Sequence, residues 1–412
     1  MSNAQLIESL KNQCQKNCNG LNVIVLQDTT EYNYQSHRGR HKKGSLGVVG
    51  NNYDVGYFAH PAICFDAFTR LPQGISYCQI WSRERERENK CQLRKILPIE
   101  EKESYRWIEA IEQTKVVLSG AEHLTFISDR ESDIYQLLSR TPDDRTDLII
   151  RSRDDRKLYD RPESMHKLLN ELPLGGNCRI KLKGDYRRNR SSREALLNIK
   201  WVEVNIRKPE SLAKSEIDKR FVTLTVIEAR EDISTCTDRE NMVHWILLTT
   251  KKVADLDQAC QIIDWYCFRW MIEQFNRITK QQGIDLESSQ LETAEGLQRL
   301  GLLGFTAALK ILQLTLARDG EHNEPIGKYF DQYETEVLKV LDKELIGTTA
   351  KQSNPFAKLT LAWAALIIAR LGGYSGYKSQ SPPGPITMRC GFDKFNVIKV
   401  GFLLGQKNVY KE

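Results

Sequence analysis

Short apolar runs alternate with helical patterns over the first 150 residues. The runs at 22–26 and 124–127 have the length of buried strands, whereas the apolar residues of 103–118 recur with helical spacing. A short helical pattern starts at Asp133, and another apolar run follows at 148–150. Further strand-like stretches lie around Val48 and at 56–65 and 75–81. This strand–helix–strand order predicts an α/β core.

The pattern changes after residue 151. Short alternating stretches at 179–183, 196–202 and 221–227 are separated by polar and basic turns, which predicts a β-rich insertion. Helical patterns dominate from residue 255 onward and are interrupted by the Pro-rich segment 379–385. The segment 359–371 is apolar nearly all round, which is typical of a helix in a core or at an interface. The pattern leaves both possibilities open.

Length and composition narrow the class of protein. A chain of 412 residues predicts two to three domains at about 150 residues each. The 40% hydrophobic content supports a sizeable core and excludes a mostly disordered chain. The net charge of +6 permits a nucleic-acid partner without establishing one.

Membrane and targeting signals are not apparent in the pattern. The longest apolar run, 301–317, is interrupted by Lys310 and Gln313, so we expect no membrane partner. The N-terminus lacks the basic-then-apolar layout of a signal peptide, which predicts a cytoplasmic protein with free thiols. Cys14 and Cys18 have ligand-like spacing, but no second pair follows and no His is near. We therefore expect ordinary helix residues there rather than a zinc site.

Three features could carry chemistry. Asp28 and Asp129 each follow an apolar strand, and catalytic groups gather beyond the carboxyl ends of strands in α/β sheets. The alternative is that each Asp caps the next turn or helix. In the helical segment 264–280, four polar residues share a sector about 60° wide at roughly 100° per residue. These are Tyr266, Arg269, Glu273 and Lys280. An amphipathic helix with a solvated face would give the same pattern.

These motifs together resemble a known family. The segments Asp28–Thr30 and Asp129–Asp133, with Tyr266, Arg269, Glu273 and Lys280 spaced by two, three and six residues, resemble DDE cut-and-paste bacterial transposases. The subgroup is the insertion-sequence-four family, of the transposon-five-like type. The resemblance extends to 101–104, 245–249 and 367–373.

The resemblance implies an α/β fold with an RNase H-like catalytic core, a β-rich insertion and a mostly helical C-terminal dimerisation region. The implied boundaries are 1–21 for an N-terminal remnant helix, 22–150 and 243–290 for the two parts of the core, 151–242 for the insertion and 291–412 for the C-terminal region. Only 27 residues precede Asp28, too few for a domain with its own core. Most of the family's N-terminal DNA-binding domain is therefore expected to be missing.

The resemblance also assigns roles to residues. Asp28, Asp129 and Glu273 would form the acidic triad that holds Mg²⁺, with Mn²⁺ as a substitute, because a pair of such ions suits phosphodiester cleavage. Tyr266, Arg269 and Lys280 would contact DNA phosphates. Trp245 would stack on a displaced base, although a buried core Trp is an equal alternative. Basic residues offer further DNA contacts, at Arg151, Arg153, Arg187, Arg188 and Arg190.

The implied function is cut-and-paste transposition of an insertion sequence, by strand hydrolysis, hairpin formation and strand transfer. The implied partners are double-stranded transposon ends and target DNA, together with a second copy of the chain or a full-length transposase. Two alternatives remain at this stage. One is a truncated, dimerising inhibitor that does not transpose, and the other is an RNase H-like nuclease without strand transfer.

Overall fold

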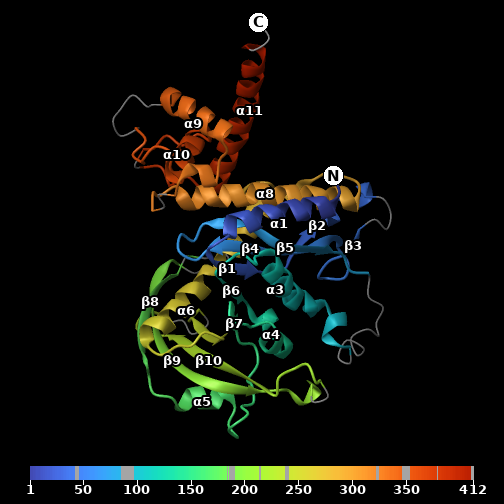
Figure 1. Ribbon diagram of the computed structural model, residues 1–412, viewed down its shortest axis with the longest axis vertical. Helices are drawn as coiled ribbons and strands as arrows, with labels where there is room; N and C mark the ends of the chain where they lie inside the picture. The colour runs from blue at the N-terminus through green and yellow to red at the C-terminus, as the bar shows by residue number, and fades with distance from the viewer. Residues whose placement is uncertain are drawn as a thin grey trace.

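One mixed β-sheet runs through the protein, as seen in a computed structural model (Figure 1). The structure describes residues 1–41, 46–84, 97–182, 184, 191–212, 215–236, 241–321, 324–345, 353–377 and 379–409, with side chains up to 405 in the last range.

The centre of the sheet has an RNase H-like order. β1 (Asn22–Gln27) pairs in parallel with β6 (His123–Ser128), and β6 pairs in parallel with β7 (Thr146–Arg151). On its other side β1 pairs antiparallel with β4 (Val55–Asp66), which pairs antiparallel with β5 (Pro72–Trp81). The order β5-β4-β1-β6-β7 confirms the predicted α/β fold class with an RNase H-like core.

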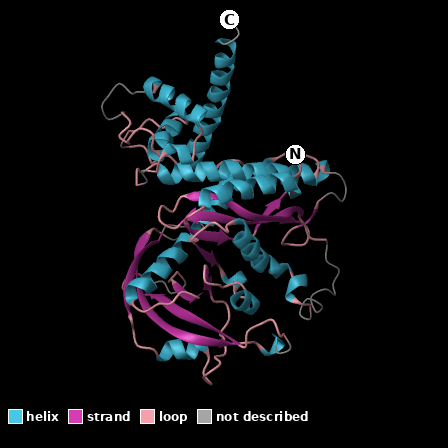
Figure 2. Ribbon diagram, viewed as in Figure 1, coloured by secondary structure: helices cyan, strands magenta, loops and turns pink. Residues whose placement is uncertain are grey.

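The β-rich insertion continues this sheet. Beyond β7 the order is β11, β10, β9 and β8, all antiparallel neighbours. Their bounds are β8 (Gly176–Leu182), β9 (Arg193–Arg207), β10 (Phe221–Glu231) and β11 (His244–Thr249). Figure 2 shows these strands as a long curved extension of the sheet. The two short strands β2 (Thr30–Asn33) and β3 (Gly47–Val48) both pair with β4.

Helices cover both faces of the sheet. Successive residues of β1 alternate between two hydrophobic clusters, with Val23 and Val25 in one and Ile24 and Leu26 in the other. The Val23 side is covered by α1 (Asn3–Cys18), α3 (Arg106–Val117), α4 (Tyr135–Arg140) and α5 (Met165–Glu171). The Ile24 side is covered by α6 (Leu256–Phe268), α7 (Trp270–Arg277) and α8 (Ala294–Ala317).

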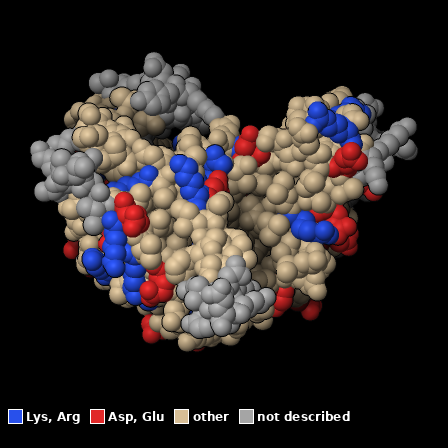
Figure 3. Space-filling model, turned by 90° about the horizontal axis from the view of Figure 1, so that it is seen from above, with Lys and Arg blue, Asp and Glu red and all other residues tan. Residues whose placement is uncertain are grey.

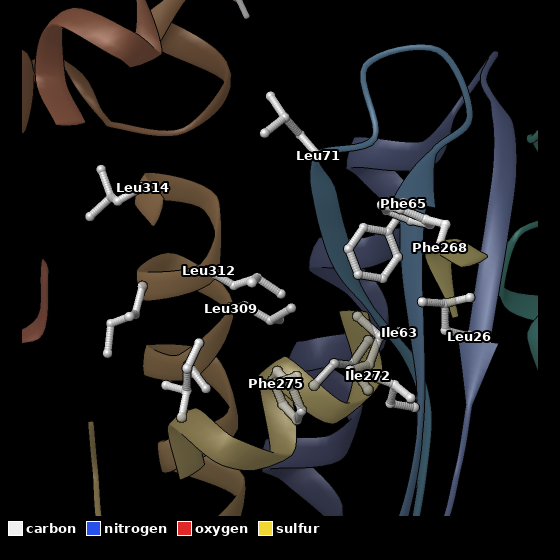
Figure 4. Packing of buried hydrophobic residues seen from close by; sticks show 14 of the residues in the cluster. Leu26, Ile63, Phe65, Leu71, Phe268, Ile272, Phe275, Leu309, Leu312 and Leu314 are labelled. Carbon is white, nitrogen blue, oxygen red and sulfur yellow. The ribbon is translucent and has the colours of Figure 1, made fainter. Parts of the chain in front are cut away.

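The C-terminal region is helical, as predicted, and packs on α8. It consists of α9 (Gln332–Glu344), α10 (Leu361–Leu371) and α11 (Pro385–Val409). Figure 1 shows α8 lying between the sheet and these helices, with the end of α11 projecting from the body. Figure 4 shows Leu26 and Ile63 of the sheet facing Ile272 and Phe275 of α7, with α8 residues packed behind.

The all-round apolar pattern of α10 is explained by burial inside the chain. Trp363, Ile367 and Ile368 are at most 1% exposed and belong to the same cluster as α8 and α11. The core interpretation of 359–371 is therefore the one that the structure supports.

Helix α8 corrects one sequence expectation. The apolar helix begins at Ala294, ahead of the apolar run 301–317, so by length and composition it could cross a membrane. Of its most apolar window, 61% is buried inside the protein. A core helix of a folded domain is buried to this extent. One helix of this kind is therefore only weak support for a membrane span.

Candidate active site

Asp28 and Asp129 leave neighbouring strands on the same face of the sheet. In the parallel β1–β6 pair, Leu26 lies opposite Ile127, and both side chains belong to the cluster under α6 and α7. Continuing this register by two residues brings Asp28 opposite Asp129. Because side chains alternate along a strand, both carboxylates emerge on the face that α6 and α7 cover.

Asp28 interrupts a strand that then resumes. Gln27 lies opposite Ala62 of β4 and Thr30 lies opposite Ala59, so β1 and β2 share one antiparallel register with β4. Asp28 therefore follows the end of β1 and of its parallel pairing with β6, as the sequence pattern predicted, and the pairing with β4 resumes in β2 at Thr30. Its Oδ1 accepts the backbone N–H of Thr29 at 2.8 Å, which fixes the carboxylate at the interruption.

The polar sector of the 264–280 segment turns partly toward the sheet. Tyr266 is 4% exposed, and its hydroxyl donates to Oδ1 of Asp129 at 3.3 Å. The Arg269 side chain is 15% exposed. The solvated-face alternative therefore fails for these two residues, since their polar groups meet a carboxylate of the sheet.

Arg269 joins two of the three predicted acidic residues. Its Nη2 donates to Oε1 of Glu273 at 2.7 Å and lies 3.8 Å from Oδ2 of Asp129. Burial lowers the pKa of Arg269, but the fields of Tyr266, Asp129, Glu273 and Asp28 outweigh it and raise the pKa above its ordinary value. The guanidinium is thus a permanent cation within the acidic cluster.

Burial changes the titration of the Asp28 carboxyl. Burial, together with the smaller effect of the neighbouring carboxylates of Glu131 and Asp129, raises its pKa to about 6. Arg269 and the Thr29 N–H act in the opposite direction. Burial also raises the pKa of Tyr266 to about 12, so its phenol stays protonated and acts as a donor to Asp129.

The helix that carries these residues is not regular throughout. α6 ends and α7 begins at Arg269, and α7 passes into a π-helical turn at Ile278–Gln282. This turn contains Lys280, whose Nζ lies 5.5 Å from the centre of the Tyr32 ring. Lys280 therefore lies beside Tyr32 of β2, which follows Asp28 by four residues.

Trp245 and Arg151 lie at the edge of the same cluster. Trp245 on β11 is half-buried and packs edge-on against Tyr266, with ring centres 5.2 Å apart. The Arg151 Nη1 at the end of β7 is 4.0 Å from Oδ1 of Asp129. Both side chains reach the face of the sheet that holds the carboxylates.

Other predicted DNA contacts are engaged elsewhere or not described. Arg153 pairs with Asp154 at 3.0 Å. Arg187, Arg188 and Arg190 lie outside the described residues. Asp133 does not begin a helix as predicted, because α4 starts at Tyr135 with Ile134 as its N-cap. The buried Asp133 instead pairs with Arg156 and accepts the Arg153 N–H at 2.8 Å, which ties the loop after β7 to the loop after β6.

Comparison with known proteins identifies the family. A family model described as "Transposase DDE domain" matches residues 102–309, half of the chain. The chain belongs to this family. The match includes Asp129 and Glu273 and begins after Asp28.

A solved structure shows a partial likeness to this DDE domain protein. It is the cryo-EM structure of a piggyBac transposase synaptic complex with hairpin DNA, with 9% sequence identity and a TM-score of 0.40. The alignment covers 75% of this chain and 50% of that chain, so this protein spans half the length of that transposase.

A buried polar network behind Asp28 was not anticipated from the sequence. Arg106 on α3 donates through Nε to the hydroxyl of Thr29 at 2.8 Å and through Nη2 to Glu131 at 3.0 Å. The Thr29 hydroxyl also meets Nδ1 of the buried His60 at 2.9 Å, and Nε2 of that ring meets Gln27 at 3.2 Å. The network holds the interruption in the strand of this DDE domain. No spacing in the sequence signals it, since α3, β1 and β4 are brought together only by the fold.

The acidic residues of the DDE domain suit a divalent cation. The Arg269 guanidinium contacts the carboxylates of Asp129 and Glu273, and its charge also acts on Asp28. Burial raises the pKa of Asp28, and a bound cation would favour its charged form. The three carboxylates do not all lie within 4.8 Å of one another. Hard oxygen donors of this kind are the ligands that Mg²⁺ and Mn²⁺ prefer.

Proposed function

We propose that this protein is a metal-dependent DNA transposase of the cut-and-paste type, from the insertion-sequence-four family. One observation carries the proposal. Asp28, Asp129 and Glu273, which are up to 245 positions apart in the chain, gather around Arg269 on one face of an RNase H-like sheet. Membership of the DDE transposase domain family supports it.

The proposed metal ligands are these three carboxylates, with Mg²⁺ as the ion and Mn²⁺ as its substitute. When bound, such ions supply a nucleophilic oxygen at neutral pH and stabilise the leaving oxygen of the phosphodiester. The protein's own residues position these ligands. Tyr266 and the Arg130 N–H, at 2.8 Å, hold Oδ1 of Asp129, while the Arg106–Thr29–His60 network holds the backbone beside Asp28.

The proposed DNA contacts surround the same cluster. Arg269 and Arg151 offer guanidinium groups within 4.0 Å of the carboxylates, where a scissile phosphate would need compensating charge. Lys280 would reach the phosphate backbone beside β2, and the half-buried Trp245 offers an aromatic edge beside Tyr266. On the face shown in Figure 3, basic and acidic residues are interspersed.

Cleavage of a pre-nicked transposon end tests the proposal. In Mg²⁺ or Mn²⁺ the wild type should cleave. Asp129→Asn and Glu273→Gln should each lower the cleavage rate by about 100-fold or more, because loss of a residue that only supports a metal ligand already costs up to about 100-fold. The control is Asp264→Asn, because Asp264 lies on the same helical segment but forms an exposed ion pair with Arg70. Equal rates for the wild type and both site variants would refute the triad.

The products separate a transposase from a nuclease. A transposase of the proposed type yields a hairpin on the transposon end and then joins that end to target DNA. A nuclease with the same acidic cluster would yield only nicked or linear products, and that result would replace the proposal of strand transfer.

We also propose that the protein acts as a homodimer on DNA. The projecting part of α11 supports this, because Val397, Val400 and Leu404 are 73%, 54% and 57% exposed on one helix (Figure 1). Exposed apolar groups at this density are typical of contact surfaces. Sedimentation at micromolar concentration that shows only monomers, with and without transposon-end DNA, would contradict the dimer.

A further inference from the structure

Three buried thiols meet where α1 packs on the sheet. Cys14 and Cys18 project from α1, and Cys64 projects from β4, 46 residues later in the chain. Their sulfur atoms all lie within 4.8 Å of one another, and all three residues are 0% exposed. Among the described residues, no other group of three potential metal ligands is this close.

The spacing of the sulfurs is that of a metal site. Thiolates bound to one tetrahedral Zn²⁺ at about 2.3 Å lie roughly 3.8 Å apart. The Sγ atoms of Cys14 and Cys18 are 3.9 Å apart. This distance follows from their positions one helical turn apart, which put both thiols on the same side of α1.

The close approach of α1 to the sheet keeps the thiols together. A Cβ added to Gly74 of β5 would lie 2.6 Å from Cβ and 2.7 Å from Cα of Cys14, so only glycine allows the helix this near. On the other side, the Cys64 thiol donates to the Ser76 hydroxyl at 3.3 Å, and that hydroxyl meets Thr114 at 2.8 Å. The packing therefore holds the three sulfurs close together before any metal ion binds.

A fourth ligand would have to come from a side chain that turns toward the three sulfurs, since among the described residues no fourth ligand atom lies within 4.8 Å of all of them. Asp66 follows Cys64 by two residues on β4, so both side chains leave the same face of the sheet. Asp66 is 9% exposed, and its charge acts on Cys18. Three thiolates and one carboxylate around Zn²⁺ carry the same net charge as the common site of four cysteines.

We propose, contrary to the expectation from the sequence for Cys14 and Cys18, that these two thiols and Cys64, with Asp66 turned toward them, form a structural site for a thiophilic divalent cation such as Zn²⁺, which fastens α1 to β4. As each sulfur binds the ion, its proton passes to solvent, and no oxidation takes place. The site lies on the opposite side of the sheet from Asp28, because Cys64 belongs to the cluster of Val23 and Val25. The proposal does not depend on the transposase function.

The metal content of purified protein tests this site. After dialysis against EDTA, wild-type protein should retain about one zinc per chain, as closed structural sites do. Cys64→Ser should lose most of this zinc. Cys78→Ser is the matched control, because Cys78 is also a buried thiol on the sheet but belongs to the opposite cluster, and it should keep its zinc.

Two further measurements distinguish this zinc site from the acidic cluster and from simple core packing. The double variant Asp28→Asn/Glu273→Gln should keep its zinc, because those carboxylates lie on the other face of the sheet. Wild-type protein refolded with Co²⁺ should show the strong thiolate-to-cobalt absorption, a readout that needs no variant to fold. Folded wild-type protein that holds no zinc and gives no such absorption would overturn the proposal and leave the three thiols as core packing only.

Discussion

At the scale of single residues, Arg269 organises the candidate active site. It contacts Glu273 and Asp129 directly, and its charge acts on Asp28. A guanidinium never loses its proton in a protein, so it offsets the carboxylates at any working pH. The same group therefore stabilises the metal-free protein and lies where a phosphate would bind.

Replacing Arg269 should expose this double role. Without the cation the three carboxylates repel one another, so Arg269→Gln should lower the metal-free stability by about 1–3 kcal/mol, between the values for surface and buried pairs. Mg²⁺ should raise the melting temperature of the variant more than that of the wild type. Thermal unfolding in EDTA and in Mg²⁺ measures both effects.

Arg70→Gln is the control for this prediction. Arg70 pairs with Asp264 at the surface, with side chains 39% and 51% exposed. Its removal should cost less than about 1 kcal/mol and leave the effect of Mg²⁺ unchanged. Equal behaviour of the two variants would show that Arg269 has no special electrostatic role.

The buried Lys310 should make stability depend on pH. Burial on α8 lowers its pKa to about 8, and Lys399 adds to the shift, against the fields of Glu334 and Asp331. Between pH 8 and the unfolded value of about 10.4, the unfolded chain binds more protons at this position, so its contribution to the free energy of unfolding rises with pH. Below pH 8 the full cost of burying the charge is present.

Lys310→Met removes that cost. The variant should be more stable than the wild type at pH 7, and the difference should shrink as the pH approaches 10. Urea unfolding of both proteins at the two pH values measures it. A difference that stays constant with pH would mean that Lys310 keeps its ordinary pKa in the folded protein.

At the scale of elements, α7 places Glu273 by burying the residues next to it. Ile272 and Phe275 are fully buried against β1 and α8 (Figure 4). The burial fixes the rotation of the helix, and this rotation brings Arg269 to Asp129 at the carboxyl end of β6 and leaves Glu273 beside Arg269. The π-turn that follows then redirects the chain toward β2, where Tyr32 donates to or accepts from Thr279 at 2.8 Å.

Ile272→Ala tests how far packing controls the site. The cavity should cost about 2–5 kcal/mol in the free energy of unfolding. It should also slow cleavage, since Glu273 would lose its fixed position. Leu303→Ala on α8 is the comparison, because Leu303 is 52% exposed and its removal should change stability by no more than about 0.5 kcal/mol. A slow but fully stable Ile272→Ala protein would argue against control through packing.

At the scale of the whole molecule, the sheet and the C-terminal helices share one core. A single cluster of buried residues extends from Ile24 on β1 through Phe305 on α8 to Phe395 on α11. The sheet covers one side of α8, and α10 and α11 cover the other. Unfolding of α8 would therefore expose apolar residues of both the sheet and the C-terminal helices.

This continuity predicts cooperative unfolding of both layers. The slowest-exchanging amides of β1 and α10 should open with the same free energy in hydrogen-exchange measurements. Urea transitions followed by circular dichroism and by tryptophan fluorescence should coincide. Earlier loss of α10 than of β1 would show that the C-terminal helices are a separate stability unit.

The features that could be predicted from the sequence depend on residues close together in the chain. The strands around Val25 and Phe126 and the helix around Phe275 follow from the periodicity of apolar residues, and the order of these elements indicated the α/β fold. The family resemblance added the three acidic residues and Arg269. The network of Arg106, Thr29 and His60 could not be foreseen, because its members are 31 and 77 positions apart and no periodicity connects them.

The sequence by itself determined the types of element and which of their faces are apolar, since these depend on neighbours a few residues apart. Tertiary structure alone decided which polar groups meet. The parallel register of β1 and β6 put Asp28 opposite Asp129, the packing of the 278–282 turn against Tyr32 put Lys280 beside β2, and the docking of α1 brought Cys64 to Cys14 and Cys18. Such meetings depend on strand order and on the rotation of packed helices, which are set by burial over the whole chain.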